Sequence, residues 1–273
     1  MKKKLASIIV CVFAIASSAQ TADVEVCYTA ISPNFRNGDV DVKNQYVLLA
    51  NASESKFFSP VTEYLDSLES SPEGAAKLQE ITRTAFLGGD MDKLPRRDGS
   101  YYVVKSMPDN TMSCYDSAGL DKFYYEEAAE GLSWEISDST KNVLGYECVK
   151  AKAEFHGRKW TVWFSPEIPV VNGPWKLGGL PGLILEAWAE DGKYAFVATG
   201  LQQCSKAIGP VYLADEYEKT DRRGFLKAKR AFLDNPLGKL NAQLGGDVKV
   251  YSESGDPVFV SSDVVDLIET DYR

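Results

Sequence analysis

The middle of the chain alternates between apolar and polar residues with a period of two. Between residues 100 and 164, short runs such as YYVVKSM, YECVKAKAEF and KWTVWF are separated by turn-forming residues at intervals of roughly ten. Alternation places successive side chains on opposite faces of a strand, so these runs predict an antiparallel meander. The runs at 183–189 and 193–202 continue it as a hairpin, because Asp191-Gly192 between them is a strong turn signal.

Helical spacing replaces this alternation in three stretches. The first predicted helix begins at Pro60 and is interrupted at Pro72, and the pattern resumes over 75–86. A further amphipathic helix is predicted over 221–236, where Asn235-Pro236 stops it. The other predicted elements are strands at 24–28, 45–51 and 248–253, and a short C-terminal helix from Ser262 to Ile268.

These elements favour one α+β domain over residues 20–273. Its main feature is a large antiparallel β-sheet meander, against which a few helices pack. One form that such a sheet can take is a half-barrel. No internal repeat, low-complexity stretch or linker divides the chain.

Residues 1–19 have the pattern of an export signal. Lys2, Lys3 and Lys4 precede an apolar run of about 12 residues, too short to span a membrane, and small residues before Gln20 mark the cleavage site. We therefore expect a protein exported to the periplasm, the cell surface or the medium, with no transmembrane segment in the mature chain. Removal of this segment leaves 27 basic against 39 acidic residues, a net charge of about −12, which argues against a nucleic-acid partner.

The mature chain would retain four cysteines, which in an oxidising compartment suggest disulfides. We predict at least one bridge, with Cys148 a participant, and the sequence does not choose among the three possible pairings. Buried free thiols are the alternative. The four candidates are Cys27, Cys114, Cys148 and Cys204.

A loop rich in glycine and proline, GPWKLGGLPGLILEA, separates two of the predicted strands. Pro181-Gly182 fits the middle of a type II turn, which requires a positive φ at Gly182. The loop also carries large apolar side chains, so it must either pack onto the protein or bind something. Its predicted turn residues are Gly173, Pro174, Gly178, Gly179, Pro181 and Gly182.

This loop and its surroundings resemble the GLPGLI family, a group of exported proteins of Bacteroidetes. The resemblance covers residues 45–200 and is strongest over the central block 132–188. It implies an exported protein with an antiparallel sheet and helices, and it implies no assigned activity.

The sequence contains no recognisable catalytic constellation. His156 is the one histidine and lies in a predicted hairpin turn, so a catalytic triad and a histidine-rich zinc site are disfavoured. We predict no catalytic residues, no metal and no cofactor, although carboxylates are too abundant for their composition to exclude a carboxylate-dependent hydrolase. Whether the protein is an enzyme stays open, with the balance against it.

The leading hypothesis is an exported, non-enzymatic binding module of the cell envelope. It would recognise an apolar or amphipathic ligand, or an envelope partner, near the loop 173–182. The alternatives are a carboxylate-dependent hydrolase and a purely structural envelope protein. The basic residues around Arg222 are interpreted as a solvated helix face, with a site for a partner or a lipid headgroup as the alternative. The candidate ligand-binding residues are Trp163, Trp175, Leu177 and Leu180.

Overall fold

The computed structural model describes residues 20–34, 40–90, 93–97, 99–129, 132–246 and 266–272. The predicted export signal, the predicted strand at 248–253 and the predicted cap Ser262 lie outside these ranges. The strands are β1 (Val24–Pro33), β2 (Val40–Ala50), β3 (Glu54–Phe58), β4 (Tyr102–Ser106), β5 (Thr111–Ala118), β6 (Asp121–Ala128), β7 (Glu135–Val143), β8 (Tyr146–Phe155), β9 (Arg158–Ser165), β10 (Leu183–Ala189), β11 (Ala195–Gln203) and β12 (Glu218–Lys219). The α-helices are α1 (Pro60–Glu69), α2 (Pro72–Leu87), α3 (Arg222–Asp234) and α4 (Pro236–Leu244).

The strands form one open sheet in the order β12-β6-β5-β4-β3-β2-β1-β11-β10-β9-β8-β7. All neighbours are antiparallel except β12 and β6, which are parallel. The predicted α+β class and the antiparallel sheet are confirmed, but the predicted meander is broken between β6 and β7, which do not pair. The N-terminal strand β1 joins the two halves of the meander, because it pairs with β2 on one side and β11 on the other.

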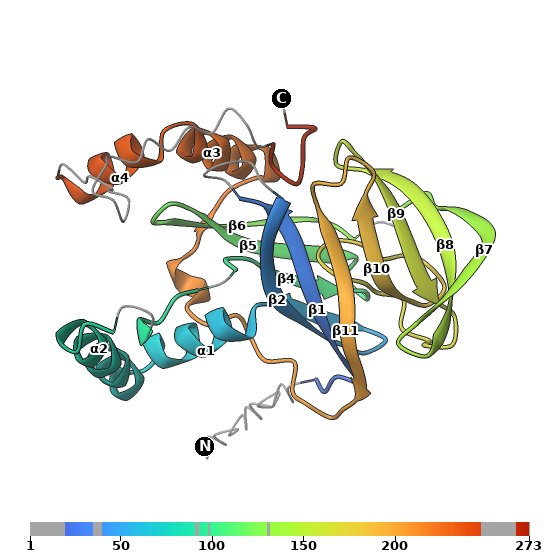
Figure 1. Ribbon diagram of the computed structural model, residues 1–273, viewed down its shortest axis with the longest axis horizontal. Coiled ribbons are helices and arrows are strands. Elements are labelled where there is room, and N and C mark those ends of the chain that lie inside the picture. Colours follow the sequence, from blue (N-terminus) through green and yellow to red (C-terminus); the bar gives the residue numbers. More distant parts are fainter. Residues whose placement is uncertain are drawn as a thin grey trace, which may run out of the picture.

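The sheet curls so that its two ends approach each other. Strands β6 and β7 lie near opposite edges, ten strand spacings apart, which in a flat sheet would be roughly 48 Å. Residues 129–134 alone connect them, and such a link reaches at most about 25 Å. Accordingly, β4, β5 and β6 lie behind β1, β2 and β11 in Figure 1.

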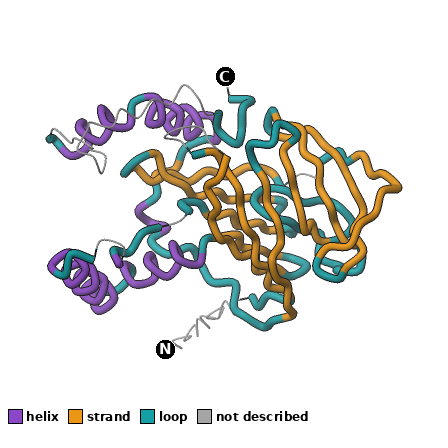
Figure 2. The backbone as a smooth tube through the Cα atoms, in the orientation of Figure 1, coloured by secondary structure: helices purple, strands orange, loops and turns teal. Residues whose placement is uncertain are grey.

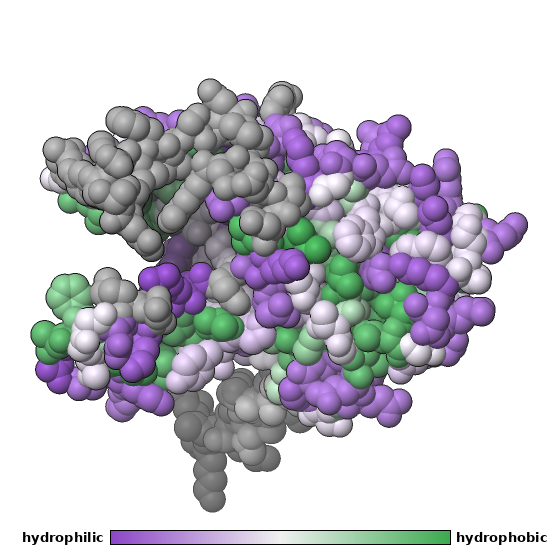
Figure 3. All heavy atoms as spheres, in the orientation of Figure 1, coloured by the Kyte–Doolittle hydropathy of each residue, from purple (hydrophilic) through white to green (hydrophobic). Residues whose placement is uncertain are grey.

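The helices lie to one side of the strands (Figure 2). A serine caps each of the first two: the Ser59 side chain accepts from the Thr62 N–H, and Ser71 accepts from Gly74. Proline follows each cap, so the predicted break at Pro72 is the start of α2 rather than a kink. In the view of Figure 3, hydrophilic and hydrophobic side chains are mixed over the strands on the right. Among the described residues, no helix is long and apolar enough to cross a membrane.

The segment between β9 and β10 packs inside the curled sheet. Trp175, Leu177 and Leu180 are 3%, 0% and 1% exposed and belong to the main hydrophobic core. Trp134, from the link between β6 and β7, donates its indole N–H to the Gly178 carbonyl at 2.9 Å. The apolar loop therefore packs onto the protein, which is the first of the two alternatives that its sequence allowed.

Gly182 turns this loop into β10. Its φ is +150°, positive as predicted but far from the roughly +80° of a type II turn. Its N–H donates to the Leu180 carbonyl at 2.7 Å, so the turn encloses Pro181 alone and has three residues. An added Cβ would lie 2.2 Å from the Ser165 carbonyl oxygen, which explains why glycine occupies the position.

Replacing Gly182 with alanine is expected to lower the free energy of unfolding by about 1–3 kcal/mol, measured by urea denaturation. The cause is the contact with Ser165, since that strand backbone pairs with β10 and cannot move freely. Gly192→Ala is the matched control, because Gly192 also has a positive φ, +72°, but nothing lies within 4 Å of an added Cβ. Equal losses in the two variants would show that the contact with Ser165 contributes nothing.

Candidate functional site

A cavity of about 190 Å³ lies inside the curled sheet, beside helix α3 and the C-terminal segment 266–272. Strands from both halves of the meander contribute to its wall, and the loop between β9 and β10 adds Trp175 and Lys176. The lining is rich in aromatic rings, which present flat apolar surfaces to a ligand. The aromatic lining residues are Tyr46, Tyr101, Tyr102, Tyr115, Tyr125, Trp175, Tyr194, Phe196 and Phe225.

Stacking holds several of these rings in place. The centroids of Tyr46 and Tyr101 are 4.7 Å apart with the planes 21° from parallel. Trp175 and Phe196 are nearly parallel, at 13°, with centroids 6.4 Å apart. Burial raises the pKa of Tyr101 and of Tyr194, so both hydroxyls stay protonated at neutral pH. The cavity therefore has a rigid aromatic wall that also carries neutral hydroxyl groups.

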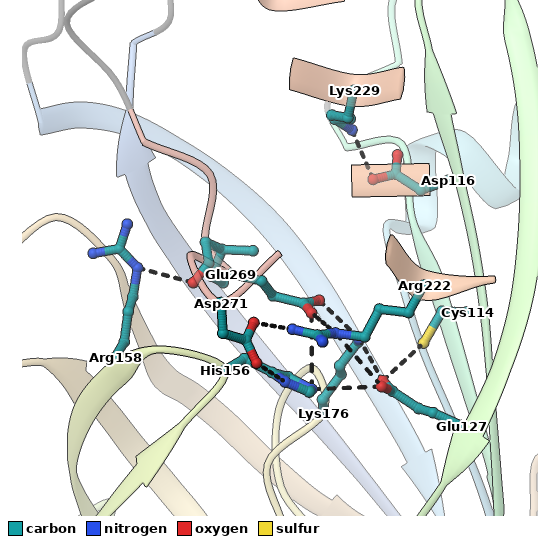
Figure 4. A network of polar contacts seen from close by, with 11 residues as sticks. Cys114, Asp116, Glu127, His156, Arg158, Lys176, Arg222, Lys229, Glu269 and Asp271 are labelled. Carbon is teal, nitrogen blue, oxygen red and sulfur yellow. Dashed lines mark hydrogen bonds and ion pairs between the residues drawn. The ribbon is translucent and has the colours of Figure 1, made fainter. Parts of the chain in front are cut away.

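An ion pair borders the cavity on the side of α3. Lys229 of α3 contacts the Asp116 carboxylate of β5 at 2.6 Å (Figure 4). Ser100 donates to the other carboxylate oxygen of Asp116 at 2.5 Å. Their side chains are largely buried, with 13% of Asp116 and 20% of Lys229 exposed. This pair offers both a hydrogen-bond acceptor and a donor to a ligand.

A second, larger network lies at the other side of the cavity, around Lys176. The Lys176 ammonium, 1% exposed, pairs with Glu127 of β6 and at 2.7 Å with Glu269 of the C-terminal segment (Figure 4). Burial would raise the pKa of Glu127, but His156 and Lys176 favour its charged form and lower that pKa to about 2. Burial would likewise lower the pKa of Lys176, yet the neighbouring Glu269 and Glu127 raise it. Glu127 and Lys176 are therefore both charged at neutral pH.

The same network fastens the C-terminal segment to the body of the protein. Arg222, at the start of α3, pairs with both Glu269 and Asp271. Arg158 of β9 donates to the carbonyls of Ile268 and Leu267, at 2.8 and 2.7 Å. Because Leu267, Ile268 and Glu269 line the cavity, these contacts complete its wall.

His156 occupies the predicted turn, between β8 and β9, with a φ of +51°. The turn brings it within 3.4–3.8 Å of Glu127, Glu269 and Asp271. His156, Glu269 and Asp271 have ligand atoms within 4.8 Å of one another, a spacing that fits a metal ion. Lys176 and Arg222 already neutralise these carboxylates, so the arrangement is that of an ion-pair network.

Lys105 of β4 fixes the loop that carries Trp175 and Lys176. Its buried ammonium donates to Asn172 Oδ1 at 3.0 Å and to the carbonyls of Gly173 and Leu177 at 3.3 and 2.7 Å. Burial lowers the pKa of Lys105 to about 7. Its three acceptors are the number that a protonated ammonium can satisfy.

The structure separates the candidate ligand-binding residues. Trp175 lines the cavity, whereas Leu177 and Leu180 are core residues that do not reach it. Trp163 lies elsewhere, half-buried on the outer face of β9 with Lys141 over its ring. The sequence analysis missed Lys176 and Glu127, and it interpreted Arg222 as part of a solvated helix face. The sequence did contain a signal for Glu127. It lies two residues after Tyr125 in a predicted strand, so both side chains are expected on the same, inward face.

The predicted disulfide is wrong. Cys27, Cys114, Cys148 and Cys204 are all free thiols in the structure, including the proposed participant Cys148. Cys114 and Cys148 are buried within strands of the two different halves of the meander, where they pack as small apolar side chains. An even number of cysteines in an exported chain does not by itself bring two of them together.

Part of the chain is similar to a known family, and its fold is similar to that of two solved structures. Residues 96–222 match the family described as N-glycanase peptide, N-terminal domain. Two solved structures of PNGF-II, in different crystal forms, have the same fold with TM-scores of 0.51 and 0.50 and 16% sequence identity. The match covers 78% of this chain but only 33% of the PNGF-II chain, so this protein corresponds to about a third of that length. No curated protein matches this sequence.

These findings correct the resemblance to the GLPGLI family. That family does not match, and the matching family is the N-terminal domain of an N-glycanase. The string itself, residues 179–184, forms the three-residue turn and the first residues of β10. A turn before a buried strand is a local arrangement that unrelated folds share, so it identifies a conformation rather than a family.

Proposed function

We propose that this protein is an exported, non-enzymatic carbohydrate-binding module that holds one sugar unit of a glycan in the aromatic cavity. The observation that carries the proposal is the composition of the cavity wall. Nine of its 24 lining residues are aromatic, and the loop between β9 and β10 contributes Trp175 and Lys176. The match to an N-glycanase N-terminal domain supports a glycan as the ligand.

A sugar ring suits this wall because it is amphipathic. Its C–H faces pack on aromatic rings, and its hydroxyl groups need both donors and acceptors. Asp116 and Ser100 offer acceptor oxygens, and the Lys229 ammonium is a donor. The charges beside the cavity are paired, Asp116 with Lys229 and Glu269 with Lys176, which suits an uncharged, polyhydroxylated ligand.

The size of the cavity limits what it accepts. At about 190 Å³ it is smaller than the roughly 300–1,000 Å³ typical of pockets for drug-sized ligands. It therefore suits a single sugar unit, with the rest of a longer glycan outside.

The charge state of the site favours binding over acid–base catalysis. A glycosidase needs a carboxyl group that is protonated near neutral pH. Glu127 has the opposite character, since its pKa is about 2, and Glu269 is paired with both Lys176 and Arg222. A purely structural protein, the other alternative, would have no reason to keep an aromatic cavity in its interior.

The test is calorimetric titration with a free high-mannose oligosaccharide that carries a chitobiose core. The wild-type protein should bind it, and Asp116→Asn should weaken binding by about tenfold or more, because a hydrogen bond to a charged group is lost. Glu126→Gln is the matched control: it changes a carboxylate of the neighbouring strand that pairs with Lys219 and does not line the cavity. Wild-type affinity in Asp116→Asn would refute the cavity as the site.

A further inference from the structure

A second aromatic surface lies on the outer face of β9 and β10, away from the cavity. Leu185 and Ala187 of β10 point into the core and are fully buried. Glu186 and Trp188 alternate with them and point outward, and Trp188 is 40% exposed. An indole this exposed on a strand is not needed to fill the core.

Trp188 is held by its polar edge, so that its ring remains available. Its indole N–H donates to Glu186 Oε2 at 3.0 Å. Lys141 of β7 contacts the same oxygen at 2.6 Å and also lies 4.6 Å from the ring centroid of Trp163. Trp163 is paired with Glu186 across the two strands, so an indole and an ion pair flank Trp188 on this side.

Polar groups with spare hydrogen-bonding capacity flank the other side of Trp188. Thr161 is its direct partner on β9. Lys152 contacts Glu190 Oε1 at 2.7 Å, and the side chains are 49% and 39% exposed. Thr161 also contacts that carboxylate, at 3.4 Å.

A hollow with a mixed polar and apolar lining adjoins this surface. Its volume is about 320 Å³, and Lys152 and Glu190 line it together with Ser133, Glu135 and Lys159. The hollow thus extends from the edge of the Trp188 surface, and its hydrogen-bonding groups carry charges of both signs.

We propose that Trp188, Glu186, Thr161, Lys152 and Glu190 form a second carbohydrate-binding site, here named the Trp188 platform. The indole would stack on one sugar ring, and the paired charges around it and in the hollow would bind hydroxyl groups of that unit and the next. Paired charges on both sides of a single exposed ring do not suit a lipid surface or the apolar centre of a protein interface. For the class of ligand this inference rests on the proposed function, but the platform shares no residue with the cavity.

The experiment repeats the calorimetric titration with the same high-mannose oligosaccharide on four variants. Trp188→Ala should weaken one of two binding events by about tenfold and leave the other unchanged, because a stacking surface is lost. Trp188→Tyr should retain that event, since it keeps an aromatic ring. Phe86→Ala, which removes a ring 67% exposed on α2, should change neither event and controls for loss of exposed apolar surface. The fourth variant, Asp116→Asn, affects only the cavity.

The two proposals fail in different ways. A single binding event that Asp116→Asn abolishes and Trp188→Ala leaves intact would overturn the platform and support the cavity. A single binding event that Trp188→Ala abolishes and Asp116→Asn leaves intact would overturn the cavity as a binding site and support the platform. Absence of any binding to the wild-type protein would overturn both.

Discussion

Replacing Lys176 with methionine is expected to destabilise the folded protein by about 3–5 kcal/mol. The variant leaves Glu127 and Glu269 facing each other without the cation between them, and their side chains are only 17% and 3% exposed. Water cannot replace the lost ammonium at such a site, so Arg222 is left to balance both carboxylates. Equilibrium unfolding in urea at pH 7 measures the effect.

Arg83→Met is the matched control for removal of a cation. Arg83 pairs with Glu80 at 2.7 Å, but more than half of each side chain is exposed, so its loss should cost less than about 1 kcal/mol. Similar losses in the two variants would contradict the account of Lys176 as the centre of a buried network.

The difference between wild type and Lys176→Met should also depend on pH. The pKa of Glu127 falls from 4.5 to about 2 on folding, so its contribution to stability is complete above pH 4.5 and is lost as the pH falls toward 2. The pKa of Lys176 rises above 10.5, so its contribution is complete below that pH. The difference should therefore be largest between pH 4.5 and 10.5 and should shrink in acid.

Replacing Trp175 with alanine is expected to cost about 3–5 kcal/mol of stability. Its ring is 3% exposed and contacts the rings of Trp160, Phe155 and Phe196, so truncation leaves a void in the main core. The alanine also retains the strained φ of +52°, and no relief of backbone strain offsets the loss. Thermal and urea unfolding measure the change.

Trp188→Ala is the control for loss of an indole, since that ring lies on the surface and its truncation creates no internal void. Trp175→Phe, which keeps an aromatic ring, should retain most of the stability and permits a binding measurement on folded protein. A Trp175→Ala protein as stable as Trp188→Ala would contradict the placement of Trp175 in the core.

The periodic parts of the fold could be predicted from the sequence. Alternation located β4 to β6 and β8 to β11, and Asp191-Gly192 correctly joined β10 to β11. Strand β3 was missed, because its five residues read ESKFF and do not alternate. Helix α4 was missed because Pro236, taken as a stop for α3, also begins a new helix after the Asn235 cap.

The site could be predicted only in part, because its groups come from distant parts of the chain. The contact between Glu127 and Lys176 depends on the curling of the sheet, and Glu269 joins them from the C-terminal segment. No spacing along the sequence encodes these distances. What the sequence did contain was the mixture of turn residues and large apolar residues around Trp175, which correctly indicated a loop that must be either buried or bound.

The central claim, that the aromatic cavity binds a sugar, is tested most directly by a crystal structure of the protein soaked with the chitobiose-cored oligosaccharide. The account predicts density for a sugar ring against Trp175 and Tyr101, with its hydroxyl groups within hydrogen-bond distance of Asp116 and Lys229. An empty cavity at a saturating concentration of the oligosaccharide would contradict it.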